Sequence, residues 1–169
     1  MKQILLAMLV VFSANTMKAN DTTKTQSATL PSVVVKKLDG TAVNIQEYAK
    51  MGKITIISFW ATWCGPCIKE LDNISELYPE WQEKYNLQLV AVSIDDSRNI
   101  PKIPTVVNGK GWDYTILTDE NKDLARALNV NNPPQTILLD EKGNIVYVHN
   151  GYVEGNEYLL EEEIKKLIK

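Results

Sequence analysis

The chain contains two cysteines, Cys64 and Cys67, and only two residues separate them. A disulfide that closes so short a loop would stabilise the fold very little, because such stabilisation grows with loop length. A structural zinc ion needs four ligands, and besides the cysteines the chain offers a single histidine, His149. The spacing therefore favours a redox pair that exchanges disulfides over a structural staple or a zinc site.

Three other functions are alternatives for the pair. A copper(I) site would use Cys64, Cys67 and His149, since thiolates are ligands that Cu(I) prefers. A binding protein could carry the two cysteines without using them in chemistry. A peroxidase is disfavoured, because the segment ATWCGPC lacks the arginine that such an enzyme places near its reactive cysteine.

The residues around the cysteines predict a strand, a turn and a helix. The run KITIISFW, residues 53–60, is rich in β-branched side chains and indicates a buried strand. After it, apolar residues recur every three or four positions from Cys67 to Tyr85, which is typical of a helix with one apolar face. Pro79 is expected to kink or split this helix.

This arrangement gives the two cysteines different tasks. Cys64 falls at the start of the helix, where free backbone N–H groups and the helix dipole favour a thiolate. We expect Cys64 to be the exposed attacking residue and Cys67, one turn inside, to be shielded and to release the partner. Pro66 suits the first helical turn, where its missing N–H costs nothing. Gly65 lets another chain approach closely.

The rest of the chain alternates short strands and helices, which predicts one α/β domain with helices on both faces of a central sheet. The closing hairpin makes that sheet mixed. The segment 95–112, with two prolines and two glycines, shows no clear pattern. The remaining predicted elements are strands near 32–38, 87–95, 113–118, 135–140 and 144–149, and helices near 44–51, 121–128 and 156–169.

The segments ISFWATWCGPCIKEL and PPQTILLDEKGNIV resemble the thioredoxin superfamily. Within it they are most similar to the exported TlpA/ResA-like thiol-disulfide oxidoreductases, from Pro31 to the C-terminus. The resemblance implies a thioredoxin fold with an extra N-terminal strand region and an insert after the central strand. It also implies that Cys64 is the nucleophile and Cys67 the resolving thiol, with no cofactor beyond their redox-active disulfide and no metal.

The same resemblance implies a cis peptide bond at Pro134, beside the disulfide, with two trans prolines as the alternative. Pro133 departs from the family pattern, because the residue before the cis-proline normally offers a backbone N–H to the partner and proline has none. Trp63 is expected to be a partly exposed contact surface, with simple packing as the alternative. With Gly65 and Pro66, these residues make up the predicted partner-binding surface.

Ser58 stands where thioredoxin has a buried aspartate that carries protons for the inner cysteine. The exported branch uses other acids, and two residues match them: Glu70, in the pattern Cys-x-x-Cys-x-x-Glu, and Asp96, after the next strand. A carboxylate in an apolar pocket has a raised pKa and can carry protons. The alternatives are a first-turn helix acid for Glu70 and a loop or cap residue for Asp96. Asp95 competes with Asp96 for the same role.

The N-terminus has the pattern of a secretory signal peptide: Lys2, then nine apolar residues at 4–12, then a polar stretch. The apolar run is too short for a membrane span, which takes about 17–25 residues. We expect cleavage near Ala19, a linker over 20–30 and a thioredoxin-like domain over 31–169, with an uncleaved tail or a core segment as the alternative. Because no cysteine lies near the end of the apolar run, a lipid anchor is disfavoured, and export to the periplasm is expected rather than a membrane tether.

The Gly-Pro pair between the cysteines resembles thioredoxin, whose reduction potential of about −270 mV lies roughly 150 mV below that of the oxidant DsbA. This difference, about 7 kcal/mol, predicts a reductant of disulfides. An exported reductant needs electrons from across the membrane, so the resemblance implies a membrane thiol-transfer protein as electron donor. It implies protein disulfides as substrates, with apocytochrome c among the substrates of several relatives.

Composition excludes some functions. Apolar residues make up 44% and charged residues 23% of the chain, as in soluble globular proteins. The net charge is −3 with both signs interspersed, which argues against a nucleic-acid surface, because phosphate binding needs a basic patch. We expect a monomer.

Overall fold

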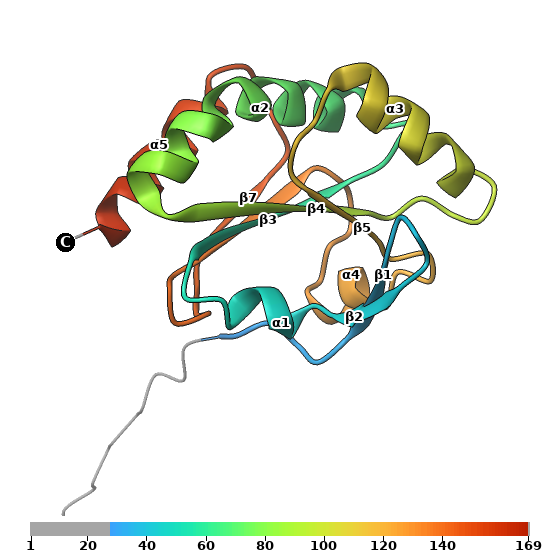
Figure 1. Ribbon diagram of the computed structural model, residues 1–169, viewed down its shortest axis with the longest axis horizontal. Coiled ribbons are helices and arrows are strands. Elements are labelled where there is room, and N and C mark those ends of the chain that lie inside the picture. Colours follow the sequence, from blue (N-terminus) through green and yellow to red (C-terminus); the bar gives the residue numbers. More distant parts are fainter. Residues whose placement is uncertain (1–27, 169) are drawn as a thin grey trace, which may run out of the picture.

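Seven strands form one sheet in the computed structural model, which describes residues 28–168 (Figure 1). The predicted signal peptide, residues 1–19, and the first part of the predicted linker lie outside the described residues. In sheet order the strands are β2 (Ala42–Asn44), β1 (Val34–Lys37), β5 (Thr115–Thr118), β4 (Leu87–Ser93), β3 (Ile54–Trp60), β6 (Gln135–Leu139) and β7 (Ile145–Asn150).

The centre of the sheet is parallel and both sides are antiparallel. β3 pairs in parallel with β4, and β4 with β5. β6 pairs antiparallel with β3 and with β7, and β1 pairs antiparallel with β5 and with β2. All seven residues of β3 are buried, as its β-branched run predicts for a strand that is covered on both faces. The predicted mixed α/β sheet is confirmed.

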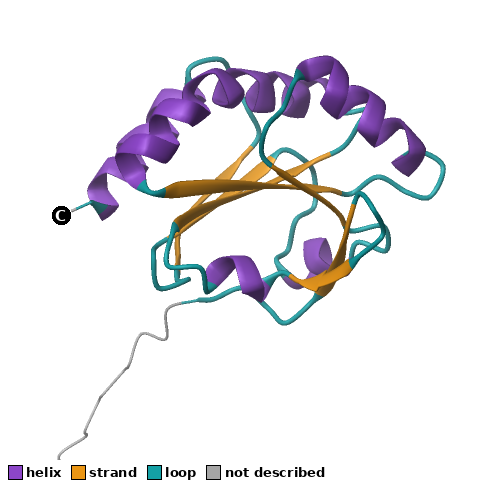
Figure 2. Ribbon diagram, in the orientation of Figure 1, coloured by secondary structure: helices purple, strands orange, loops and turns teal. Residues whose placement is uncertain are grey.

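Helices cover both faces of the sheet (Figure 1 and Figure 2). One group, which includes the helix that begins beside Cys64, lies on one face of the sheet, and a group of shorter helices lies on the other face. The first group is α2 (Gly65–Tyr85), α3 (Ile103–Lys110) and α5 (Asn156–Leu167). The second is α1 (Gln46–Ala49) and α4 (Asp123–Ala127), and a 3-10 turn, η1 (Ile100–Lys102), precedes α3.

Helix α2 is continuous through Pro79, so the predicted split does not occur. Pro79 is exposed, and the buried residues Tyr78 and Trp81 on either side of it anchor the helix to the core. This packing offsets the hydrogen bond that a proline removes from a helix interior. The apolar stripe from Cys67 to Trp81 is buried, as the helical period predicts.

The segment without a clear sequence pattern, 95–112, contains α3. Pro101 and Pro104 lie in the first turns of η1 and α3, where proline is favoured rather than disruptive. Ile103 and Val107 lie one helical turn apart and are both buried. The strand β2 is a second element that the sequence analysis missed, and with β1 it forms the predicted extra N-terminal strand region.

The folded body begins before the predicted linker ends. The side chain of Leu30 is only 2% exposed, and its carbonyl accepts a hydrogen bond from Gln46 Nε2 at 2.9 Å. The carbonyl of Ala28 accepts one from the backbone N–H of Ile145 at 2.7 Å. Residues 28–30 are therefore attached to the domain.

Candidate active site

The strand β3 leads directly to the cysteine pair. Cys64 is the N-cap of α2, and its sulfur is bonded to that of Cys67 at 2.00 Å. The backbone N–H of Cys67 also points at Cys64 Sγ, with N and S 3.3 Å apart. Cys67 is completely buried and Cys64 is 6% exposed. The difference has the predicted direction, but Cys64 is far less exposed in this disulfide-bonded form than the sequence suggests.

Hydrogen bonds to the Asp95 side chain hold the turn before Cys64 in place. Asp95 is fully buried, and its carboxylate accepts hydrogen bonds from the backbone N–H and the hydroxyl of Thr62, each at 2.8 Å. The hydroxyl of Ser93 donates a third bond at 2.8 Å. Sequence reasoning considered Asp95 only as a competing proton carrier, whereas the contacts make it the anchor of this turn.

The exposed rim of the site consists of residues next to the disulfide in sequence. Trp63 is 59% exposed, as predicted, and Gly65 and Pro66 are exposed as well. The bond between Pro133 and Pro134 is cis, as the resemblance implies. Because Gln135 pairs with Phe59, Pro134 lies at the end of the sheet where β3 turns toward the cysteines.

Glu70 lies one helical turn after Cys67 and is 3% exposed. Its Oε1 accepts a hydrogen bond from Thr136 Oγ1 at 2.8 Å, and its Oε2 is 3.5 Å from Ser58 Oγ. Burial raises the pKa of Glu70 to about 7, and the charge of Glu157 adds to the rise, while the two hydroxyls oppose it. The structure thus buries the Glu70 carboxyl, as expected of a proton carrier, although hydroxyl groups and not only apolar side chains surround it.

Asp96 is not brought into this pocket. Its carboxylate accepts hydrogen bonds from the Arg98 guanidinium at 3.0 and 2.6 Å, and both side chains face solvent. The Arg98 hydrogen bonds lower the pKa of Asp96. The expected apolar pocket is therefore absent at Asp96, because a loop residue that follows a strand can point outward and find a cationic partner.

His149 lies on β7, where it pairs with Thr136 of β6. Its Nε2 is 2.7 Å from Asn156 Nδ2, and its Nδ1 is 3.3 Å from the Tyr147 hydroxyl. Within residues 28–168, no group of three or more His, Cys, Asp or Glu side chains is gathered as metal ligands. The structure thus does not unite His149 with the two cysteines.

Two groups around Glu70 escaped the sequence analysis: Thr136 and Glu157. Thr136 reaches Glu70 because β3 and β6 pair in one particular register, which no local pattern specifies. Glu157 lies in the first turn of α5, where an acid is common for local reasons. Its burial, at 5% exposure, is the signal that separates it from an ordinary surface acid.

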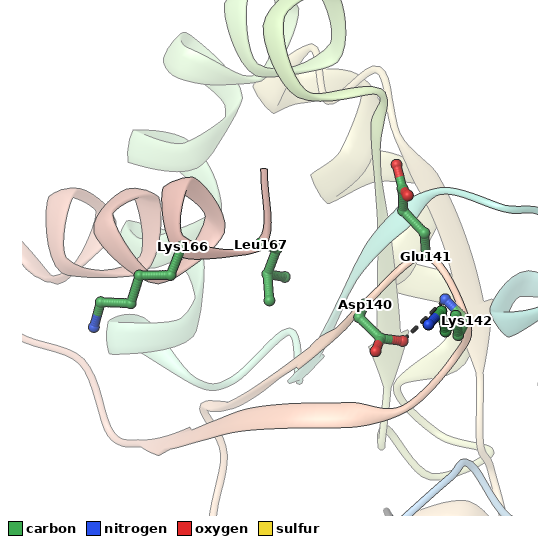
Figure 3. Close-up of a pocket in the computed structure, with 5 residues that line it drawn as sticks. All are labelled: Asp140, Glu141, Lys142, Lys166 and Leu167. Carbon is green, nitrogen blue, oxygen red and sulfur yellow. Dashed lines mark hydrogen bonds between the residues drawn. The ribbon is translucent and has the colours of Figure 1, made fainter. Parts of the chain in front are cut away.

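A separate pocket lies between the β6–β7 turn and the end of α5 (Figure 3). It has a volume of about 320 Å³ and is lined by residues of the β6–β7 turn and the end of α5: Asp140, Glu141, Lys142, Lys166 and Leu167. Asp140 Oδ1 accepts hydrogen bonds from backbone N–H groups of that turn. The Asp140 side chain therefore stabilises the β6–β7 turn. This turn follows the last residue of β6, whereas Pro134 precedes the first residue of β6.

Comparisons with known proteins match most of the chain. A model of the AhpC/TSA family matches residues 27–148. The thiol-disulfide oxidoreductase ResA from Geobacillus thermodenitrificans is 30% identical over 156 residues, which cover 89% of this chain and 86% of that protein. The family match includes the cysteine pair, Glu70 and the cis bond, and it ends before His149 and Glu157.

Solved structures of thioredoxin-like proteins are also similar to this chain. A thioredoxin-like protein from Porphyromonas gingivalis is 42% identical, with a TM-score of 0.74 over 82% of this chain and 91% of that chain. StoA from Bacillus subtilis is 26% identical, with a TM-score of 0.62 over 78% of this chain and 98% of that chain. The architecture is therefore that of thioredoxin-like proteins.

Proposed function

Since this chain belongs to the AhpC/TSA family and is a thiol-disulfide oxidoreductase similar to ResA, we propose that it reduces protein disulfides outside the cytosol. The observation that carries this proposal is the Cys64–Cys67 disulfide at the start of α2, with one sulfur near the surface and the other fully buried. Such an unequal pair suits an enzyme that attacks with one cysteine and resolves with the other.

The reaction begins with the reduced pair. The Cys64 thiolate attacks one sulfur of the partner's disulfide, and the other partner sulfur leaves with the electron pair and takes up a proton. The Cys67 thiolate then attacks Cys64 Sγ and displaces the second partner sulfur, which is protonated in turn. Two electrons have passed to the partner, and the Cys64–Cys67 disulfide seen in the structure has formed.

The start of α2 stabilises the attacking sulfur. Free backbone N–H groups at a helix N-terminus favour a negative charge, and the N–H of Cys67 is directed at Cys64 Sγ. Because Cys67 has no exposed surface, a bulky protein disulfide can reach only Cys64. The mixed disulfide therefore forms at Cys64, where Cys67 can resolve it.

Glu70 is the proposed proton carrier for Cys67. The two residues are one helical turn apart on the buried face of α2. With a pKa of about 7, the Glu70 carboxyl exchanges protons readily near neutral pH. It takes the proton of the Cys67 thiol before resolution and returns a proton when the disulfide is reduced again. Asp96 has neither the burial nor the raised pKa for this task and is left out of the proposal.

The partner is proposed to dock on the exposed rim around the disulfide. Trp63 offers a large, accessible ring, and Gly65 and Pro66 present little side chain to a close-lying backbone. The cis bond between Pro133 and Pro134 is a second part of this surface. Pro133 has a backbone carbonyl that can accept a hydrogen bond but no N–H that could donate one. A partner strand would thus find one donor fewer here than in relatives without this second proline.

Export and electron supply complete the proposal. The signal-like N-terminus supports passage to the periplasm, with a membrane thiol-transfer protein as the electron donor and disulfides of exported proteins, such as apocytochrome c, as substrates. Among the described helices, none has the length and apolar character needed to cross a bilayer.

Insulin reduction with the two cysteine variants tests the function. We expect the wild type to reduce insulin disulfides in the presence of dithiothreitol, and Cys64→Ser and Cys67→Ser to lose this activity. Only Cys67→Ser should accumulate mixed disulfides in the native host, since it keeps the attacker and lacks the resolving thiol. Failure of Cys67→Ser to trap any partner would favour a binding protein that does not use its cysteines.

The direction of electron flow is tested separately. Equilibration of the pair with thiol buffers should give a reduction potential closer to the value of about −270 mV of thioredoxin than to that of about −120 mV of DsbA. A value near that of DsbA would make the protein an oxidant instead.

A further inference from the structure

A row of polar side chains crosses three strands under α2 and α5. Ser58 of β3 pairs with Thr136 of β6, and Thr136 pairs with His149 of β7. Directly paired residues point to the same face of a sheet. Two members of this row, Ser58 and Thr136, contact the Glu70 carboxyl. The row therefore leads from Glu70 to the edge strand of the sheet.

A second buried carboxyl lies where α5 begins. Glu157 Oε2 accepts hydrogen bonds from the Tyr152 hydroxyl at 2.7 Å and the backbone N–H of Gly155 at 3.0 Å. The Gly155 bond is an ordinary interaction at a helix start. The Tyr152 bond connects Glu157 to α2, because the Tyr152 hydroxyl also accepts a hydrogen bond from Asn73 Nδ2 at 2.6 Å. Asn73 lies one turn after Glu70 on α2, and its Nδ2 is also 3.5 Å from Glu157 Oε1, so it links the two helices.

Glu70, Glu157 and His149 all line one small cavity. Its volume is about 10 Å³, close to the smallest space that holds a single water molecule. Its wall is partly polar, so a water there would find the partners that it needs. The complete lining is Glu70, Ile74, Thr136, Tyr147, His149, Asn156, Glu157 and Leu160.

We propose that Glu157 is a positioning residue that acts through Glu70, and that the cavity between them is the route by which Glu70 exchanges its proton with solvent. The proposal rests on the role of Glu70 in the proposed function. Glu70 is 3% exposed and lies one helical turn from the fully buried Cys67, so a proton that it carries needs a path to solvent. Tyr152 and Gly155, which hold Glu157, are the half-buried residues of an otherwise exposed connection between β7 and α5, where such a path would reach the surface.

The proton balance along this route is simple. Glu70 takes a proton from the Cys67 thiol and gives it to a water molecule in the cavity. That water passes a proton on toward solvent at the connection between β7 and α5, while Glu157 acts only through its charge beside Glu70. No electron moves along the route, because both electrons stay with the sulfur atoms.

Several titratable groups face Glu70, and all bear on its protonation. Cys67 lies on the same helix, and Ser58 and Thr136 contribute hydroxyls from below. The other titratable groups are His149 and Tyr147 on β7, Glu157 on α5 and Tyr114 before β5, whose own pKa the charge of Glu70 helps to raise. Among them, Glu157 is the group whose negative charge raises the pKa of Glu70.

The first experiment titrates Glu70 in the oxidised protein by carboxyl NMR, comparing wild type, Glu157→Gln and Glu154→Gln. Glutamine keeps the shape of Glu157 and can still accept the Tyr152 and Gly155 bonds. Loss of the charge should lower the pKa of Glu70 by about one unit. Glu154→Gln is the matched control, because Glu154 lies in the same connection but is exposed and paired with Lys69.

An unchanged Glu70 titration in Glu157→Gln would overturn the proposal. If Glu157→Gln fails to fold, Glu157→Asn is measured instead; it also removes the charge and should lower the pKa of Glu70, so an unchanged titration there would overturn the proposal as well. These measurements use the oxidised protein and need no enzymatic activity. They therefore remain decisive even if the wild type reduces no protein disulfide, which would contradict the proposed function alone.

The second experiment follows the proton route itself. Reduced protein is mixed with glutathione disulfide, and formation of the Cys64–Cys67 disulfide is followed by tryptophan fluorescence across a range of pH. In Glu157→Gln the rate should fall roughly tenfold at its plateau, and its rise with pH should begin at lower pH, because Glu70 ionises earlier. A wild-type rate profile together with a lowered melting temperature would show that Glu157 serves only to hold α5 in place.

Discussion

The pocket around Glu70 and the loop after β4 each hold a carboxyl group. In the pocket, Glu70 is 3% exposed and meets two hydroxyl groups, and its pKa is raised to about 7. On the loop, Asp96 faces solvent beside the Arg98 guanidinium, and its pKa is lowered. The same chemical group is thus prepared for proton transfer in one region and kept as a permanent anion in the other.

Asp95, the neighbour of Asp96, shows that burial alone does not make a proton carrier. Asp95 is fully buried, yet its carboxylate accepts two bonds from Thr62 and one from Ser93. These bonds attach the carboxylate to the turn before Cys64 and to the end of β4. Glu70 has fewer donors and a negative neighbour, Glu157, so burial dominates there. The balance between donors and burial therefore decides the task of each acid.

The largest expected effect concerns stability. The pKa of Glu70 is about 7 in the folded protein and 4.5 is its ordinary value, so the folded state holds a proton that the unfolded chain releases between these values. Wild type should therefore lose stability relative to Glu70→Gln as pH rises from about 4.5 to about 7, by about 3 kcal/mol. Urea unfolding of both proteins over this range, with the disulfide intact, measures the difference. A constant difference across the range would contradict the buried, proton-holding state of Glu70.

The next effect is on the rate of disulfide formation. Glu70→Gln should slow the step in which Cys67 resolves the mixed disulfide by roughly a hundredfold near neutral pH, since the local base is lost. The measurement is the single-turnover oxidation of the reduced protein. Glu76→Gln is the control, because Glu76 lies on the same helix and is exposed. Equal rates in the two variants would remove Glu70 from the mechanism.

A smaller effect is expected at the anchor below the turn. Asp95→Asn replaces one accepting oxygen by a donor, so a hydrogen-bonding group of Thr62 or Ser93 loses its partner. The cost should be about 1–2 kcal/mol in the free energy of unfolding. Urea unfolding of wild type and Asp95→Asn at neutral pH, with the disulfide intact, measures the difference. Equal free energies of unfolding for the two proteins would contradict the role of Asp95 as the anchor of the turn.

The smallest effect is expected on the loop. Asp96→Asn should leave both the unfolding free energy and the pH profile of disulfide formation unchanged, because exposed ion pairs contribute little. Arg98→Gln, which removes the other partner, serves as the matched comparison. A displaced pH profile in Asp96→Asn alone would return Asp96 to the list of proton carriers and weaken the contrast between the two regions.

Much of the fold follows from local patterns in the sequence. The β-branched run of β3 and the apolar stripe of α2 each reflect burial that repeats with the period of the element, so both were predicted. The helix α3 was missed because its prolines look disruptive until it is known that they fall in first turns. The strand β2 was missed because it has three residues, too few for a period to show.

The relations within the candidate site are likewise of two kinds, those between neighbours along the chain and those between distant segments. The sequence by itself determined the Cys64–Cys67 pair, its place at a helix start and the position of Glu70 one turn further on, because these relations depend on neighbours along the chain. Only the tertiary structure decided that Thr136 and Glu157 surround Glu70 and that Asp96 points to solvent. Those relations depend on strand register and helix packing between distant segments. Such packing sets the exposure of each carboxyl and the charges near it, and these two quantities fix its pKa.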